Sequence, residues 1–133
     1  MEKIFNHLKQ NPNVSFATVD AKGNVQSRIF QIAAIQDRKI FFFTSNKKSV
    51  FQQIKANPNI AFSNFEKGQA VRVNGKVTVL TDVKLKEEIL EKNPGIKAIY
   101  RTSSNPSLEL IAISPTSAEI GDYTQSPPKI EKF

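Results

Sequence analysis

The stretch 70–80 constrains the fold more than any other part of the sequence. Apolar and polar residues alternate along it, and four valines share one phase: Val71, Val73, Val77 and Val79. Successive side chains of a β-strand point to opposite faces, so the pattern predicts a strand with one buried face and one face that is wet or meets a ligand. Gly75 falls in the phase of the valines, which predicts a bulge or a close approach of another segment.

Other strand-forming stretches lie on both sides of this one. Their ranges are 14–20, 25–35, 40–43, 60–65, 108–114 and 117–123. Turns at 21–24 and 36–38 are expected to join the first three into a meander, and a turn at 115–116 to separate the last two. Short helices are predicted at 1–10, 48–56 and 83–92, with a further helical turn before Arg101. Six to seven strands in hairpin order with few helices predict a mainly β protein, a closed or partly closed antiparallel barrel.

Length and composition exclude several kinds of site. The 133 residues predict a single domain, 1–133, whose proline-rich end at 126–133 is a flexible or extended tail. There is no cysteine, and no histidine or carboxylate pair has metal-ligand spacing, so thiol catalysis and a metal site are not expected. His7 is expected to have a surface or packing role. No apolar run has the length of a membrane span and no signal peptide is recognisable, which predicts a cytoplasmic protein without membrane partners.

The positive charge is unevenly distributed. The net charge is +7, and residues 21–65 hold seven basic residues against one acidic residue, whereas the remainder holds 12 against 11. Lys22, Lys39 and Lys55 are best explained as solvated surface charges. A nucleic-acid binder would interleave its basic residues with exposed aromatic side chains, but the aromatic run 41–43 has the pattern of a buried strand. A basic nucleic-acid-binding barrel is therefore the least favoured interpretation, and no nucleic-acid partner is expected.

The stretch 39–58 predicts an anion site. Its apolar strand 40–43 ends in small polar residues, and the helix that follows is stopped by Asn57 and Pro58. The start of a helix has free backbone N–H groups and the positive end of the helix dipole. Two lysines and a serine stand at that start: Lys47, Lys48 and Ser49. Together these groups form a corner suited to an anion, most often a phosphate.

Arg28 is a second candidate for the same anion. If its strand pairs with the strand 40–43, the guanidinium lies near the helix start and can bind a phosphate bidentately. An exposed strand arginine is an equally good interpretation of the spacing. Because no strong nucleophile or base is recognisable, the catalytic residues stay unassigned. A bound cofactor that brings its own reactivity explains the pattern better than a hidden triad does.

Three segments resemble a known family when taken in order. They are SRIFQI, KIFFFTSNKKSVFQQIKANPNIAF and VRVNGKVTVL, and the resemblance extends over about residues 14–120. The set is similar to the pyridoxamine 5'-phosphate oxidase-like FMN-binding split barrels. The resemblance implies an antiparallel split barrel of Greek-key type that is a homodimer, with FMN bound at the subunit interface.

The resemblance also implies roles for individual residues. The FMN phosphate would be held by Arg28 and Lys48, with help from Ser49 and Lys47. The backbone beside the isoalloxazine ring would be that of Ile29, Phe30 and Gln31. The ribityl and phosphate region would be lined by Thr44 and Ser45, with Phe43 nearby. Gln52 would approach the flavin from the following helix. The second face of the ring would be covered from the partner subunit by the strand with Arg72 and Asn74.

Two departures from the family pattern qualify these roles. Ser49 and Val50 stand where the family commonly has an arginine-lysine pair, which leaves open whether Lys47 or Lys48 is the phosphate ligand. The end of the chain lacks the arginine- and tryptophan-bearing segment associated with pyridoxamine phosphate oxidation, so a different small-molecule substrate is expected. The leading hypothesis is an FMN-dependent oxidoreductase. The alternative is a flavin-binding carrier or sensor that is not an enzyme.

Overall fold

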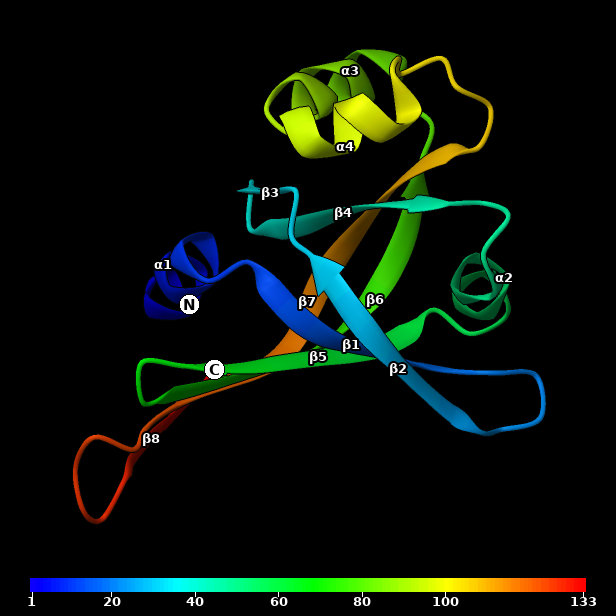
Figure 1. Ribbon diagram of the computed structural model, residues 1–133. Helices are drawn as coiled ribbons and strands as arrows, with labels where there is room; N and C mark the ends of the chain where they lie inside the picture. The colour runs from blue at the N-terminus through cyan, green and yellow to red at the C-terminus, as the bar shows by residue number, and fades with distance from the viewer.

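Eight strands and four helices make up the computed structural model, which describes residues 1–133 (Figure 1). In chain order they are α1 Glu2–Gln10, β1 Asn13–Val19, β2 Val25–Gln31, β3 Ala34–Gln36, β4 Lys39–Ser45, α2 Ser49–Ala56, β5 Asn59–Glu66, β6 Gln69–Leu80, α3 Val83–Glu91, α4 Pro94–Tyr100, β7 Leu108–Asp122 and β8 Lys129–Lys132. None of the helices combines the length and the apolar character that crossing a bilayer requires.

All strands belong to one antiparallel sheet that curls into a half-barrel. The order is β2-β1-β5-β6-β7-β4-β3, and β8 pairs with β7 outside this path. Four strands separate β2 from β4 in the sheet, yet the rings of Phe30 on β2 and Phe42 on β4 lie 5.9 Å apart. The sheet therefore bends until its two ends meet around a shared core. This architecture confirms the predicted mainly β, antiparallel split-barrel fold.

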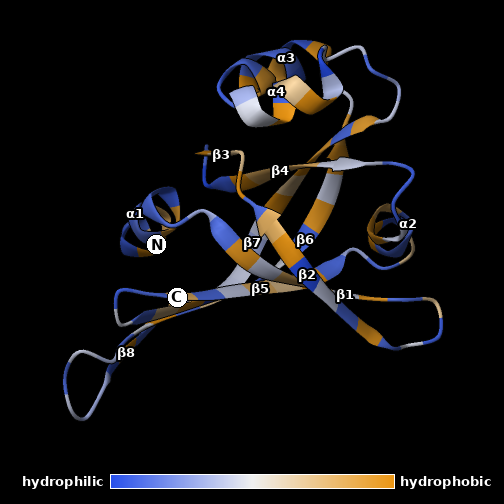
Figure 2. Cartoon of the chain, viewed as in Figure 1, coloured by the Kyte–Doolittle hydropathy of each residue, from blue (hydrophilic) through white to orange (hydrophobic).

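Aromatic side chains fill the interior of the half-barrel. The Phe16 ring lies 4.9 Å from that of Phe30 and 5.2 Å from that of Phe42, and Phe62 packs on the same group. Helices α1 and α2 add buried residues to this core, while α3 covers a smaller cluster built around Phe41. Figure 2 shows hydrophobic colour along the crossing strands and hydrophilic colour in most connections. Burial of this apolar surface is the main stabilising term of the fold.

The prediction of a single strand at 25–35 is wrong, because the structure has two strands there, β2 and β3. Strand β2 pairs with β1, whereas β3 pairs with β4, so the expected three-strand meander does not form. The backbone changes partners at the junction: the Ile32 N–H donates to Pro12 and the Ala33 N–H donates to Phe41. Because β1 and β4 lie far apart in the sheet order, one continuous strand cannot pair with both.

The prediction of a turn at 115–116 is also wrong, since strand β7 continues through these residues. Gly75 lies opposite Pro115 and Asn74 lies opposite Ser117, which leaves Thr116 as an extra residue on β7. This register shift confirms the bulge predicted at Gly75. A Cβ atom at Gly75 would lie 2.7 Å from Ile113 Cγ2 and from the Ser114 carbonyl oxygen, so the close approach requires glycine.

The proline-rich tail includes a strand that the sequence did not predict. Strand β8 pairs with β7 along 119–122, and most of its residues are exposed. At the other end of the chain, His7 is buried on α1 and its Nε2 lies 3.0 Å from Asn64 Oδ1. The histidine therefore has a packing role, as the sequence indicated.

Candidate functional site

The connection from β4 to α2 leaves backbone donors free at the helix start. Ser45 shapes the turn: its Oγ accepts the Lys47 N–H at 3.2 Å and its carbonyl accepts the Lys48 N–H at 3.1 Å. The N-cap residue, Lys48, makes no side-chain cap. The N–H groups of Ser49 and Val50 form no hydrogen bond within the protein. These unpaired donors and the positive end of the helix dipole favour an anion at this point.

The charged side chains beside this helix start are exposed. Lys47, Lys48 and Ser49 all reach solvent, and neither lysine forms an ion pair within the protein. Both ammonium groups are therefore available to an incoming anion. Nothing in the geometry of the turn distinguishes Lys47 from Lys48 as its ligand.

Arg28 lies on the inner face of the sheet and contacts α2. Its register partner on β1 is Phe16, so both side chains project toward the interior. Nη1 donates to the Phe16 carbonyl at 3.3 Å and to Thr18 Oγ1 at 2.8 Å, and Nη2 donates to Gln53 Oε1 at 3.0 Å. Burial lowers the pKa of Arg28 below its ordinary value, although an arginine stays cationic at neutral pH.

Sequence reasoning missed both side chains that accept from Arg28. The Thr18 hydroxyl donates to Gln53 Oε1 at 2.6 Å, so Thr18, Arg28 and Gln53 form a closed triangle of hydrogen bonds. The sequence does contain one sign of this contact: Thr18 is a polar residue at a position where the alternation of β1 predicts a buried, apolar side chain. The prediction that β2 pairs with β4 is wrong. The guanidinium reaches α2 across β1 instead.

The guanidinium keeps donors for a ligand. A guanidinium has five N–H groups, and three of those on Arg28 are used by Phe16, Thr18 and Gln53. The Nε–H and the second Nη2–H form no hydrogen bond within the protein. No carboxylate forms an ion pair with Arg28. Its positive charge is thus not neutralised within the protein, and one edge of the guanidinium has two free N–H donors. This arrangement suits two oxygens of a phosphate.

Thr44 adds a polar atom without a partner. Its side chain is buried, and Oγ1 is the one buried side-chain polar atom that lacks a hydrogen bond. Such an atom costs free energy unless a bound group satisfies it. Phe43 points to the opposite face of β4, where it packs on the smaller cluster around Phe41. Thr44 and Phe43 therefore do not line one surface.

The residues predicted beside a flavin ring lie on the outermost strand of the sheet. Ile29 is 70% exposed and Gln31 is exposed, whereas Phe30 is half-buried against Phe16. Because β2 ends the sheet, its outer edge has backbone groups without strand partners. Gln52 is exposed on α2 and forms no side-chain hydrogen bond within the protein. Its neighbour Gln53 makes the contact with Arg28.

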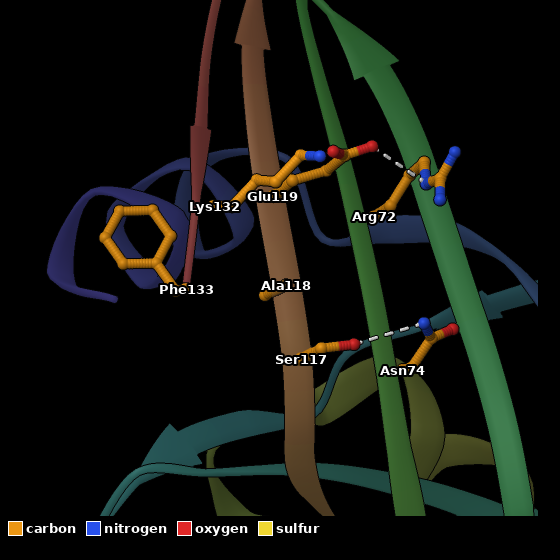
Figure 3. Close-up of a pocket in the computed structure, with 7 residues that line it drawn as sticks. All are labelled: Arg72, Asn74, Ser117, Ala118, Glu119, Lys132 and Phe133. Atoms are coloured by element: carbon orange, nitrogen blue, oxygen red, sulfur yellow. Dashed lines mark hydrogen bonds and ion pairs between the residues drawn. The ribbon is translucent and has the colours of Figure 1, made fainter.

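Arg72 and Asn74 are not brought to Arg28 within one subunit. Both lie on the outer face of β6, because the alternating Val71 and Val73 are buried. Arg72 Nε forms an ion pair with Glu119 Oε1 at 3.1 Å, and Asn74 donates to Ser117 Oγ at 3.2 Å. These residues line an open hollow of about 320 Å³ (Figure 3). The hollow and the Arg28 triangle lie on opposite faces of the sheet.

Comparison with known proteins gives consistent matches. Residues 1–120 match the family described as Pyridoxamine 5'-phosphate oxidase. A pyridoxine/pyridoxamine 5'-phosphate oxidase from Cupriavidus taiwanensis is 38% identical over 83 residues, which cover 61% of this chain and 39% of that protein. The match thus spans about two fifths of the length of the curated relative.

Solved structures share the fold at lower identity. A NimC/NimA family protein from Clostridium acetobutylicum has a TM-score of 0.82 at 21% identity, covering 100% of this chain and 92% of that one. A pyridoxamine 5'-phosphate oxidase-related, FMN binding protein from Nostoc punctiforme has a TM-score of 0.69 at 14% identity, covering 96% and 83%. At these identities the likeness concerns the fold.

Proposed function

The chain belongs to the pyridoxamine 5'-phosphate oxidase family, and from this premise we propose that it binds FMN and acts as an FMN-dependent oxidoreductase on a small molecule. One observation carries the proposal. The Arg28 guanidinium and the start of α2 offer free donors and positive charge, with no carboxylate to compensate them. The FMN binding relative from Nostoc punctiforme, which shares the fold, supports the choice of cofactor.

In this proposal the phosphate binds between Arg28 and the first turn of α2. Gln53 is one helical turn beyond Ser49, and its contact with Arg28 fixes the guanidinium against α2. The Nε and Nη2 groups of Arg28 donate to two phosphate oxygens, and the Ser49 and Val50 amides donate from the helix. Lys47 and Lys48 add charge from the solvent side. The unpaired Thr44 Oγ1 fits the same polar tail of the cofactor.

The bound flavin would supply the redox chemistry, and the chain would supply binding, orientation and exclusion of water. The outer backbone edge of Ile29, Phe30 and Gln31 orients the ring through hydrogen bonds. Phe30 holds this edge in place by stacking on Phe16. The apolar side chain of Ile29 is exposed in a single subunit. When a second protein surface covers this side of the sheet, Ile29 helps to shield the ring from water.

We also propose that the second surface belongs to another copy of the chain. Arg72 and Asn74 face away from Arg28 in their own subunit, so only a partner's copies can meet the flavin. The outer face between β2 and β6 has short side chains that allow close approach: Ser15, Ala17, Ala61 and Ser63. Analytical ultracentrifugation at micromolar protein concentrations should give the mass of a dimer. A monomer that still binds FMN would contradict this arrangement.

An absorbance spectrum and a reduction assay test the proposed activity. The purified protein, after incubation with FMN and desalting, should show a protein-bound flavin spectrum in the visible range. Anaerobic NADH or NADPH should then bleach this spectrum, and an electron acceptor should restore it. A flavin that stays bound but resists both steps would favour the carrier or sensor instead. A colourless protein after desalting would contradict FMN binding itself.

A further inference from the structure

We propose that Gln53 and Thr18 are positioning residues that present Arg28 to the phosphate in its fully charged state, and that Gln53 makes the site selective for a phosphorylated flavin. The inference rests on the proposed function, because it concerns the site in which Arg28 binds the FMN phosphate. It adds Thr18 on β1 to the site and gives Gln53 on α2, which fixes the guanidinium, a further role in selectivity.

The geometry of the triangle explains the positioning. Thr18 Oγ1 and Gln53 Oε1 lie 2.6 Å apart, and each accepts from a different terminal nitrogen of the Arg28 guanidinium. Two acceptors at this spacing occupy one edge of the guanidinium, as the two oxygens of a carboxylate do. The Phe16 carbonyl oxygen accepts a second hydrogen bond from Nη1. The guanidinium is held at three points, with the Nε and Nη2 edge left open.

The chemistry of the acceptors explains the selectivity. A carboxylate at position 53 would hold the guanidinium equally well, but it would neutralise the charge that attracts the phosphate. Gln53 is neutral, and so are Thr18 and the Phe16 carbonyl. All contacts within the protein therefore fix the orientation of Arg28 and leave its charge for the ligand. Arg28 is half-buried, where an uncompensated charge acts on a ligand more strongly than in open water.

The decisive variant is Gln53→Glu, compared with Ala56→Glu, which adds the same charge to an exposed position of the same helix. Dissociation constants for FMN and for riboflavin, which lacks the phosphate, are measured by quenching of flavin fluorescence. For Gln53→Glu we expect FMN to bind at least about tenfold more weakly, as for the loss of a close charge pair, with riboflavin unchanged. The thermal midpoint without flavin should not fall, since the new carboxylate pairs with Arg28. Ala56→Glu should leave both dissociation constants unchanged.

A neutral variant separates orientation from charge. Gln53→Met keeps the volume and removes the acceptor, and it should weaken FMN binding by roughly two- to tenfold, the range for one lost hydrogen bond. Equal losses for FMN and riboflavin, together with a lower thermal midpoint, would mean that Gln53 is merely structural. Wild-type affinity of Gln53→Glu for FMN would overturn the inference while leaving the proposed function intact. If the wild-type protein binds neither flavin, the proposed function fails and the inference fails with it.

Discussion

Arg28 on the edge strand β2 donates through Nη2 to Gln53 on α2 over 3.0 Å, joining two residues that are 25 positions apart in sequence. The contact connects the outermost strand of the sheet to the helix that follows β4. It brings a guanidinium without a carboxylate partner against the second turn of a helix whose first amides are free. The proposed phosphate site depends on both sides of this contact, the guanidinium of Arg28 and the start of α2.

Replacing Arg28 should remove most of the affinity for FMN. Arg28→Ala loses a charged, two-pronged donor, which corresponds to about 1.5–3 kcal/mol of binding free energy. Arg28→Lys should recover part of it, because an ammonium supplies the charge without the fork. Isothermal titration with FMN measures both values, and Lys22→Ala, an exposed lysine in the β1–β2 turn, serves as the control. Equal affinity of Arg28→Ala and the wild type would exclude Arg28 as a phosphate ligand.

The helix start can be tested by removing a single backbone donor. Proline is favoured at the first helical position, and Lys48 already has the extended backbone, with φ −85° and ψ 148°, that suits a residue before proline. Ser49→Pro should therefore keep α2 and the thermal midpoint while it weakens FMN binding several-fold. Ser49→Ala, which keeps the N–H group, separates the backbone from the hydroxyl. If both variants bind FMN as the wild type does, the amide of residue 49 does not contact the phosphate.

The aromatic core should determine whether the half-barrel closes. Phe42 is fully buried and contacts Phe16, Phe30 and Phe62, which connects the two ends of the sheet. Phe42→Ala should lower the free energy of unfolding by about 3–5 kcal/mol, the usual range for a buried phenylalanine. Ile99→Ala, at a residue that is 73% exposed, should change it by less than about 0.5 kcal/mol. Urea denaturation gives both values, and similar losses for the two variants would contradict the described core.

Two glycines should respond to alanine in opposite directions. At Gly75 the added methyl group meets the Ser114 backbone at 2.7 Å, so Gly75→Ala should destabilise the protein by about 1–3 kcal/mol. At Gly95, inside α4, the new Cβ has no atom within 4 Å apart from its chain neighbours and the backbone of its own helix, and alanine should stabilise by about 0.4–1 kcal/mol. Thermal unfolding of the two variants measures the difference. Stabilisation by Gly75→Ala would mean that the bulge at this position is not as described.

The β1–β2 turn should weaken in acid. Asp20 accepts the Asn24 N–H, and also accepts from Gln26 and Lys22, which lowers the pKa of its carboxyl below the ordinary 3.8. The stability from the ionised carboxylate is fully present above 3.8 and is lost as the pH falls through the lower folded-state pKa. The difference in thermal midpoint between the wild type and Asp20→Asn should therefore shrink as the pH falls from 3.8 through the folded-state pKa of Asp20. A constant difference across the acid range would contradict the role of the carboxylate.

Local patterns in the sequence were enough to predict elements but not their partners. The alternation of Val71 and Val73 predicted β6, and the phase of Gly75 predicted its bulge, because both depend on neighbours along the chain. The division of 25–35 at Ile32 depends on β1 and β4 lying far apart in the sheet, which no local propensity encodes.

The candidate site shows the same limit. Lys48 and Ser49 were recognisable because they stand at a helix start. The contact of Thr18 with Gln53 was not, since it joins residues 35 positions apart and arises only when α2 packs on β1. A phosphate-binding Arg28 was one of two equal interpretations, and it was linked to the helix start through a pairing of β2 with β4 that does not exist. The fold brings it to the helix by a different route.

The most direct test of the proposed phosphate site is a titration of the wild-type protein with FMN, monitored by flavin fluorescence polarisation, with riboflavin titrated in parallel. We predict saturable binding of one FMN per subunit and markedly weaker binding of riboflavin, because the Arg28 donors and the free amides of α2 act on the phosphate. Polarisation that stays unchanged with FMN, or equal affinities for FMN and riboflavin, would contradict a phosphate site at this position.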